Sequence, residues 1–322
     1  MVDNTPLLLG SSGYSLREAF GKSLVSLAFS DQGFVVFDAD VAGGTGAHHF
    51  RAAYPERFFQ FGIAEQNMFS AAAGFASTGI TPIVTSFAVF CMRALEQIRL
   101  SIAYSKSNVK IVASHPGLDV GPDGASAQAL EDLAVFRSLP NMLVVSPADA
   151  IETEQATKAI LEYHGPVYMR TGRSPTPRLF DTHYRFELGK GKVLTEGHDA
   201  SIIACGVEVA RALQAASLLQ AQGISVRVVN MATIKPIDQT LIVDCVEKTG
   251  CIVTAEDHNV LGGLGSAVAE VVTKTMPCPI EFVGVNDRFG ESGEPDELAE
   301  KYGLTPPYIM NAVKRTIARK ES

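Results

Sequence analysis

The sequence predicts an α/β fold made of two doubly wound domains with mainly parallel sheets. Two observations support this prediction. Short apolar runs alternate with longer helix-like patterns, and a polar stretch near residue 180 interrupts the alternation before it starts again. Alternation of this kind is typical of buried parallel strands connected by helices. A chain of 322 residues is also long enough for two domains.

The candidate strands divide into two groups. The first group comprises residues 34–40, 81–87, 109–114, 142–147 and 166–171, and the second comprises 200–206, 224–230, 251–257 and 280–287. We expect a first domain at 1–180, a linker at 181–192 and a second domain at 193–322. In doubly wound folds the ligands bind at the carboxyl ends of the strands, so the functional residues are expected there.

Composition and charge narrow the possible partners and the cellular compartment. The formal charge is −8 and Lys and Arg form no run, which argues against nucleic acid and anionic membranes as partners. No apolar run reaches the roughly 18 residues of a membrane span, and no signal region begins the sequence, so we expect a cytoplasmic protein. Five scattered cysteines without C-x-x-C spacing favour a reduced compartment. No carboxylate or cysteine stands at ligand spacing from His48 and His49, so we expect this chain to bind no metal.

One acidic residue stands out in an otherwise apolar stretch. Residues 59–77, FQFGIAEQNMFSAAAGFAS, are predicted to form a buried helix that carries Glu65 in its first turn. The residues alone leave two interpretations. A glutamate at a helix start is favoured by the helix dipole by about 0.3 to 1 kcal/mol, and a carboxylate in an apolar site can also serve chemistry.

Several motifs occur together in an order that resembles the transketolase family. FGIAEQNMFSAAAGFA, TSFAVFCMRALEQIRLSIA and SHPGLDVGPDGASAQALEDLAVFRSLPNMLVVSPAD resemble its pyrimidine-binding domain. HDASIIACGVEVA, NMATIKPID and AEDHNVLGGLGSAVAE resemble its C-terminal domain. The resemblance covers nearly the whole chain. It implies a thiamine diphosphate-dependent transferase of aldehyde or ketone residues.

The resemblance also implies a partner. The Gly-Asp-Gly stretch ending in Asn, which binds the diphosphate and Mg²⁺ in full-length members, does not occur in this sequence. The chain is therefore expected to be the C-terminal half of a split, two-subunit enzyme. A separate N-terminal-type subunit would hold Mg²⁺ or Ca²⁺ and share thiamine diphosphate with this chain in an α2β2 hetero-oligomer. Residues 190–322 are expected to be mainly structural.

The resemblance assigns the cofactor residues. Glu65 would hydrogen-bond N1′ of the aminopyrimidine ring and favour the imino tautomer that generates the thiazolium ylide. Phe87 and Phe90 would pack against the aminopyrimidine ring, and their spacing of three residues places both on one side of a helical turn. Asp40 would lie near the cofactor. Plain core packing is the alternative for the two phenylalanines.

Four residues are assigned to the substrate in the same way. His115 would approach the acceptor sugar or its phosphate and act with Glu65 in catalysis, and Asp123 would bind a substrate hydroxyl. Arg17 and Arg173 would contact phosphate, whose geometry fits the guanidinium fork, and Arg170 is a weaker candidate. The alternatives are a cap on the strand end for His115, a turn residue for Asp123 and solvated surface arginines.

Three departures from the family pattern leave the identity of the substrate undecided. Ala127 stands where transketolases carry a second histidine in this loop, Arg93 where they carry a third aromatic residue, and residues 43–45 where they carry a phosphate-binding serine. We expect transfer of a two-carbon ketol unit from a ketose phosphate to an aldehyde. Two alternatives remain. One is an acyl or acyloin-type transferase, including one like deoxyxylulose phosphate synthase, that uses keto substrates; the other is a catalytically silent structural or regulatory subunit.

Overall fold

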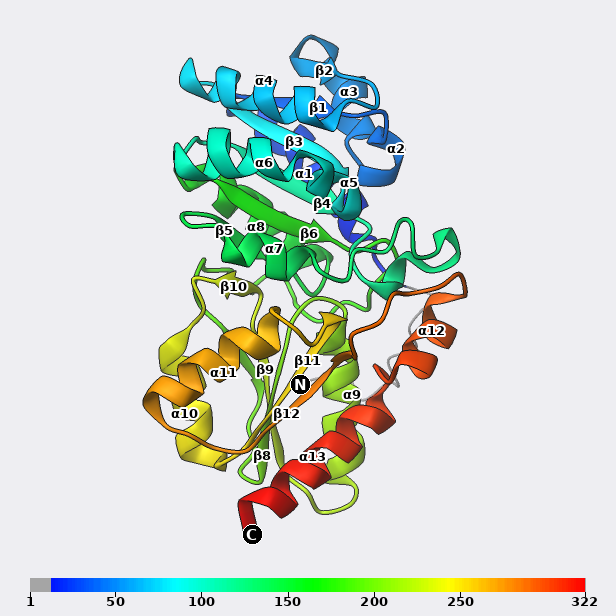
Figure 1. Cartoon of the computed structure of the whole chain (residues 1–322), viewed down its shortest axis with the longest axis vertical. Coiled ribbons are helices and arrows are strands. Elements are labelled where there is room, and N and C mark those ends of the chain that lie inside the picture. The colour runs from blue at the N-terminus through cyan, green and yellow to red at the C-terminus, as the bar shows by residue number, and fades with distance from the viewer. Residues whose placement is uncertain (1–12, 322) are drawn as a thin grey trace.

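The computed structural model describes residues 13–321, which form two sheets placed one after the other along the long axis of the molecule (Figure 1). The first sheet has seven strands in the order β10-β5-β6-β4-β3-β1-β2, and the second has five in the order β12-β11-β8-β9-β7. Pairing is parallel except at β10 with β5 and at β7 with β9. The α/β fold class with mainly parallel sheets is confirmed.

The strands of the first sheet are β1 Phe34–Asp38, β2 Phe58–Gln60, β3 Thr81–Phe87, β4 Lys110–Ser114, β5 Leu143–Val145, β6 Val167–Thr171 and β10 Thr233–Lys235. Those of the second are β7 Lys192–Thr195, β8 Ala200–Ala204, β9 Val226–Asn230, β11 Ile252–Asn259 and β12 Ile280–Val285. Every residue of β1, β4, β6, β8 and β9 is buried. Continuous burial of this kind is expected where helices cover both faces of a parallel sheet.

The helices of residues 13–190 are α1 Leu16–Ala28, α2 Ala42–Thr45, α3 His48–Ala53, η1 Pro55–Arg57, α4 Glu65–Ser77, α5 Ala88–Cys91, η2 Met92–Ala94, α6 Leu95–Gln97, η3 Ile98–Tyr104, η4 Leu118–Asp123, α7 Asp132–Ser138 and α8 Ala150–Glu162. Those that follow are α9 Glu208–Gln220, α10 Gln239–Thr249, α11 Leu264–Thr275, α12 Pro295–Tyr302 and α13 Pro306–Glu321. Side chains cap several starts: Ser15, Asp149 and Asp238 each accept a backbone N–H of the first turn.

The predicted helix at 59–77 is wrong at its start. Residues 58–60 form strand β2, and the helix begins only at Glu65. Gly62 has a positive φ of 66°, which turns the chain between the two elements. Ile63, expected in a buried helix, is 82% exposed in this turn.

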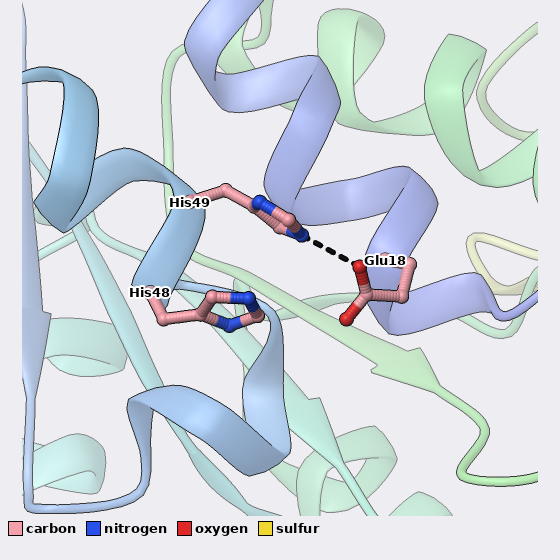
Figure 2. Close-up of side chains that lie close together, drawn as sticks. All are labelled: Glu18, His48 and His49. Atoms are coloured by element: carbon pink, nitrogen blue, oxygen red, sulfur yellow. Dashed lines mark hydrogen bonds and ion pairs between the residues drawn. The ribbon is translucent and has the colours of Figure 1, made fainter.

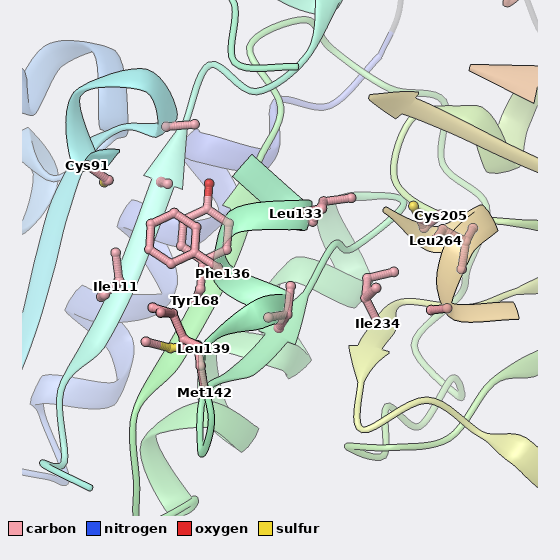
Figure 3. Packing of buried hydrophobic residues seen from close by; sticks show 14 of the residues in the cluster. Cys91, Ile111, Leu133, Phe136, Leu139, Met142, Tyr168, Cys205, Ile234 and Leu264 are labelled. Atoms are coloured by element: carbon pink, nitrogen blue, oxygen red, sulfur yellow. The ribbon is translucent and has the colours of Figure 1, made fainter. Parts of the chain in front are cut away.

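The hydrophobic core is continuous between the two sheets. One cluster contains Leu133 and Phe136 from α7 together with Ile234 and Leu264 from the later part of the chain (Figure 3). Strand β10 joins the edge of the first sheet although its sequence follows β9 of the second. A short strand contributed across the junction leaves no periodic signal, so the sequence does not predict it.

A buried ion pair of the first part also contacts the second part. Asp132 at the start of α7 pairs with Arg170 of β6, and Arg170 donates in addition to the backbone carbonyl of Asp257 on β11. Asp132 is fully buried, and its contacts with Arg170 hold the pKa of its carboxyl below the usual value despite burial.

Within residues 13–321, every helix is too short or too polar to span a lipid bilayer.

Candidate active site

Glu65 is a buried carboxylate at the first position of α4. It is only 5% exposed. The interaction found for its carboxylate among residues 13–321 is an ion pair with Arg93, whose Nε lies 3.4 Å from Oε2. Arg93 belongs to η2, and its own side chain is 70% exposed. A carboxylate taken out of water with one loose, solvent-facing partner retains most of its hydrogen-bonding capacity.

Two phenylalanines and a histidine form a stack of rings at the ends of β3 and β4. The rings of Phe87 and Phe90 are stacked with centroids 5.3 Å apart, and Phe87 also stacks on His115 at 3.7 Å. The helical turn predicted from their spacing is present, because Phe87 caps α5 and Phe90 lies within it. Both phenylalanine rings are partly exposed, so the stack offers a free aromatic surface.

His115 is held as a neutral imidazole. Burial, with Arg17 and Arg173 nearby, lowers the pKa of His115 to about 3. Its Nδ1 lies 2.9 Å from the hydroxyl of Ser114, and its backbone has a left-handed φ of 59°. A neutral imidazole can donate one hydrogen bond and accept another, so it can hold a substrate hydroxyl without bringing charge.

Arg17 reaches this stack through the loop after β1. Its Nη1 donates to the carbonyl of Gly44 over 3.2 Å, and its buried Nε has no partner within the described chain. A Cβ on Gly44 would lie 2.6 Å from the Phe87 ring, so only glycine allows this loop to lie against the ring. Burial and the neighbouring Arg173 lower the pKa of Arg17. A half-buried guanidinium with an unused donor suits an anionic ligand.

Arg173 contacts the η4 segment that carries Asp123. Arg173 Nη1 donates to the carbonyl of Val120 at 2.7 Å, and Nη2 lies 3.8 Å from the half-exposed carboxylate of Asp123. The structure thus brings Arg17, Arg173 and His115 close enough to influence one another, with Asp123 at the rim. Ala127, farther along the same loop, is nearly buried and offers no side-chain hydrogen bond.

The second part of the chain fixes this loop. The carboxylate of Asp257 at the end of β11 accepts the backbone N–H groups of Leu118 and Asp119 at 2.8 and 3.1 Å. Gln128 donates to the carbonyl of Glu291, again from one part of the chain to the other. Burial raises the pKa of Asp257. Residues 190–322 therefore hold this loop in place through hydrogen bonds, and the expectation of a mainly structural role for them stays a prediction.

Two predicted residues lie differently from the main group. Asp40 is exposed after β1 with a left-handed φ of 64°, and its N–H donates to the Gln60 side chain. The buried acid is instead Asp38, which Gln60 also binds, and burial raises its pKa. Arg170 is not free for phosphate, because it is engaged with Asp132.

A carboxylate does lie beside His48 and His49, contrary to what their sequence neighbourhood predicts. Glu18 of α1 faces both histidines of α3 across the space between the helices (Figure 2). Its Oε2 lies 2.6 Å from Nε2 of His49. The sequence does not reveal this contact because the two residues are 31 positions apart.

Comparisons with known proteins agree with this architecture. Residues 12–178 match the family model described as transketolase, pyrimidine binding domain, and residues 189–309 match transketolase, C-terminal domain. A putative transketolase C-terminal section from Methanocaldococcus jannaschii is 46% identical over 95% of this chain and 97% of its own length. The 6-deoxy-6-sulfo-D-fructose transketolase subunit SqwH of Clostridium sp. is 39% identical over 98% and 99%.

Other similar proteins define the extent of the match. A solved structure of a split gene transketolase, described as an inactive beta4 tetramer, is 51% identical and superposes with a TM-score of 0.90 over 96% of this chain and all of that chain. Human transketolase is 37% identical over 94% of this chain, which corresponds to 49% of its own length.

The fold and these matches define a protein of the thiamine diphosphate-dependent transferase type. The chain belongs to the transketolase family. The resemblance stated from its motifs is confirmed, including its similarity over nearly the whole chain to C-terminal halves of split transketolases.

Proposed function

We propose that this chain is the pyrimidine-binding subunit of a split transketolase, and that Glu65 holds a proton at N1′ of thiamine diphosphate. The observation that carries the proposal is the buried Glu65 carboxylate, 5% exposed, whose ion-pair partner among residues 13–321 is the exposed Arg93. A buried carboxylate normally has firm hydrogen-bond partners. A ring nitrogen of the cofactor supplies such a partner, and the hydrogen bond between them is charge-assisted.

The other residues fit the same end of the cofactor. The partly exposed stack of Phe87 and Phe90 provides a flat surface for the aminopyrimidine ring. When bound, thiamine diphosphate supplies the thiazolium carbon that takes up the transferred group. The protein orients the ring, excludes water and holds the proton at N1′. Asp40 is proposed to lie at the rim of this cofactor site.

The substrate is proposed to lie between His115 and the arginines. His115 donates or accepts a hydrogen bond at the sugar as a neutral imidazole, Asp123 binds a hydroxyl, and Arg17 and Arg173 bind the terminal anion. The donor is a ketose phosphate and the acceptor an aldehyde. The name of the Clostridium relative specifies a sulfonated sugar, and a sulfonate would suit the same pair of arginines.

A partner subunit completes the proposed site. Ile63, Leu100 and Tyr104 are exposed large apolar residues, at 82%, 48% and 78%, next to or on the packed elements α4 and η3. Exposed large apolar residues on neighbouring elements are typical of an interaction surface. We propose that a subunit with the diphosphate and Mg²⁺ (or Ca²⁺) site docks here in an α2β2 assembly. A related split gene transketolase is described as an inactive beta4 tetramer, in line with a need for that partner.

The test compares the chain alone, the chain mixed with its N-terminal-type partner, and the same mixture carrying Glu65→Gln. Calorimetry measures binding of thiamine diphosphate with Mg²⁺, and a coupled assay measures cleavage of ketose phosphates, sulfonated ketoses and keto acids. We expect binding and turnover only in the mixture. Glu65→Gln should lower kcat by about 10² to 10⁴, the usual contribution of a positioned proton-transfer group.

Exposed Glu96 of α6 provides the matched control, because Glu96→Gln removes a nearby carboxylate and should leave kcat unchanged. Turnover of keto acids alone would move the proposal to an acyl transferase. Full turnover with Glu65→Gln, or cofactor binding by this chain without any partner, would contradict the assignment.

A further inference from the structure

Three metal-ligating side chains meet outside the proposed cofactor site. Glu18 comes from α1, and His48 and His49 are the first two residues of α3 (Figure 2). One ligand atom from each lies within 4.8 Å of the others. Ligands of one tetrahedral Zn²⁺ at about 2.0 to 2.1 Å lie about 3.3 Å apart, so side-chain shifts of roughly 1 Å would complete a site.

The backbone beneath the cluster is closely packed. A Cβ on Gly21 would lie 2.1 Å from the carbonyl oxygen of Gly46, and a Cβ on Gly46 would lie 2.0 Å from that of Arg17. Helix α1 and the turn before α3 therefore touch backbone to backbone. This contact fixes the separation of Glu18 from the two histidines, so binding an ion would require little ordering of the chain.

The hydrogen bonds already resemble those of a metal site. Nε2 of His49 lies 2.6 Å from the Glu18 carboxylate. Nδ1 of His48 lies 3.4 Å from the carbonyl oxygen of Ala42. An imidazole that donates one N–H to a backbone carbonyl presents the lone pair of its other nitrogen, as metal-binding histidines do.

The cluster is open to solvent, so an ion can enter. The side chains of His49 and Glu18 are 29% and 38% exposed. Two cations lie near Glu18. Lys22 is exposed and screened by water, so its repulsion of a bound ion is small, whereas Arg17 is half-buried and donates to the carbonyl of Gly44.

We propose that Glu18, His48 and His49 bind a divalent transition-metal ion, and that Zn²⁺ suits this ligand set best. Two imidazoles and one carboxylate are a zinc ligand set that leaves one position open to water. Mg²⁺ prefers oxygen ligands, so it does not compete here. The ion joins α1 to α3 directly beside Arg17, the residue that precedes Glu18 and donates to the carbonyl of Gly44 in α2.

Zinc binding is measured on the full chain without an affinity tag, after removal of metal by a chelator. Calorimetric titration with Zn²⁺ is expected to show one ion per chain, and the same titration with Mg²⁺ should show none. Co²⁺, used as a spectroscopic probe, should give the visible absorption of a tetrahedral site, and excess Zn²⁺ should abolish it.

Single substitutions decide whether the cluster is responsible. Glu18→Gln, His48→Gln and His49→Gln should each weaken Zn²⁺ binding by more than about tenfold. His48→Gln removes a ligand and a ring contact with His49 but leaves both members of the Glu18–His49 contact in place, so it is the variant expected to disturb folding least. The control is His198→Gln, because His198 is a 78% exposed histidine 3.7 Å from Asp199.

Loss of binding in the three variants with retention in His198→Gln supports the site. Equal Zn²⁺ affinity in all four variants, or no binding by the unmodified chain, overturns it. These outcomes involve neither thiamine diphosphate nor turnover, so they are independent of the proposed transferase function.

Discussion

At the scale of single residues, His115 combines burial with a conformation that few residues adopt. It is 3% exposed, stacks on Phe87 and has a left-handed φ of 59°. At neutral pH the imidazole is unprotonated in the folded and the unfolded chain alike, so its neutral state does not lower stability. In acid the unfolded chain takes up a proton on this residue and the folded chain does not. The histidine therefore connects the candidate site to the acid stability of the whole chain.

We expect His115 to make the protein less stable in acid. The folded-state pKa is about 3, below the unfolded value near 6.5, so the unfolded chain binds more protons between these two values. Stability therefore falls as the pH falls through this window, by at most about 1.4 kcal/mol per pH unit for one group. In His115→Asn, which tolerates the left-handed backbone, this slope should be smaller.

Urea unfolding measured from pH 4 to 7 tests this expectation. The comparison uses slopes, because the substitution also removes the contact with Phe87. Burial raises the pKa values of Glu152 and Glu208 to about 7, so these two groups make stability fall as the pH rises. Their contribution is the same in both proteins and cancels when the two slopes are subtracted. Identical slopes would show that His115 titrates normally in the folded chain.

Arg93 is expected to compete with the cofactor for Glu65. The ion pair across 3.4 Å has one partner 70% exposed, and pairs of this kind contribute about 0.2 to 1 kcal/mol. Arg93→Met should therefore tighten thiamine diphosphate binding by up to about fivefold in the mixture with the partner subunit. Calorimetry measures the change, and Arg99→Met, an exposed substitution in η3, is the control. Weaker binding in Arg93→Met would mean that Arg93 itself holds the cofactor or substrate.

The sequence could predict the positions of residues that belong to local motifs. The spacing of Phe87 and Phe90 was enough to predict their shared face, and the motif around Glu65 was enough to place it in a helix start. Contacts between distant segments were not predictable. Glu18 meets His49 from 31 positions away, and Asp257 meets the loop at Asp119 from 138 positions away. Only the packing of elements creates such pairs.

At the scale of elements, η4 and its loop depend on a strand of the other sheet. Asp257 of β11 accepts two backbone N–H groups of this loop, and Gly117 lies so close that a Cβ there would meet the carboxylate at 2.1 Å. The loop carries Asp123 and follows His115. Its position is therefore set by the second part of the chain.

Asp257→Ala should loosen the loop. It leaves buried N–H groups unpaired, and each such group costs about 1 to 3 kcal/mol. We expect a lower free energy of unfolding and, in the assembled enzyme, a KM that rises more than kcat falls. Asp257→Asn keeps one acceptor oxygen and should recover part of both effects. A change in stability with unaltered KM would show that the position of the loop does not affect substrate binding.

The elements that the sequence missed share a physical cause. All nine predicted strands are present, whereas β2, β7 and β10 were not predicted. They are three or four residues long, and β2 and β7 contain no buried residue. A strand that short and exposed shows neither a continuous apolar run nor an alternation, so only its neighbours reveal it.

At the scale of the whole molecule, the shared core predicts that the two sheets unfold together. The cluster of Leu133, Phe136, Ile234 and Leu264 crosses the junction, and the pair of Asp132 with Arg170 lies beside it. Asp132→Ala leaves a buried arginine uncompensated and should lower the free energy of unfolding by about 3 to 5 kcal/mol.

Hydrogen exchange measured by mass spectrometry distinguishes the two sheets. Peptides from β4 and β9 should lose protection together in Asp132→Ala, because they belong to one cooperative unit. Asp296→Ala, at an exposed position of α12, should leave both peptides protected. Loss of protection in β4 alone would show that the sheets are independent, as the predicted boundary at 181–192 suggests.

Strand β10 has a consequence for synthesis of the chain on the ribosome. It forms the last strand beside β5, yet it is made well after β6 has completed the rest of that sheet. Until residues 233–235 emerge, the nascent sheet exposes the backbone groups of β5 along an open edge, and such edges pair readily with other chains. A chaperone that shields this edge, or a pause in translation that prolongs its exposure, should therefore govern how much of the protein escapes aggregation.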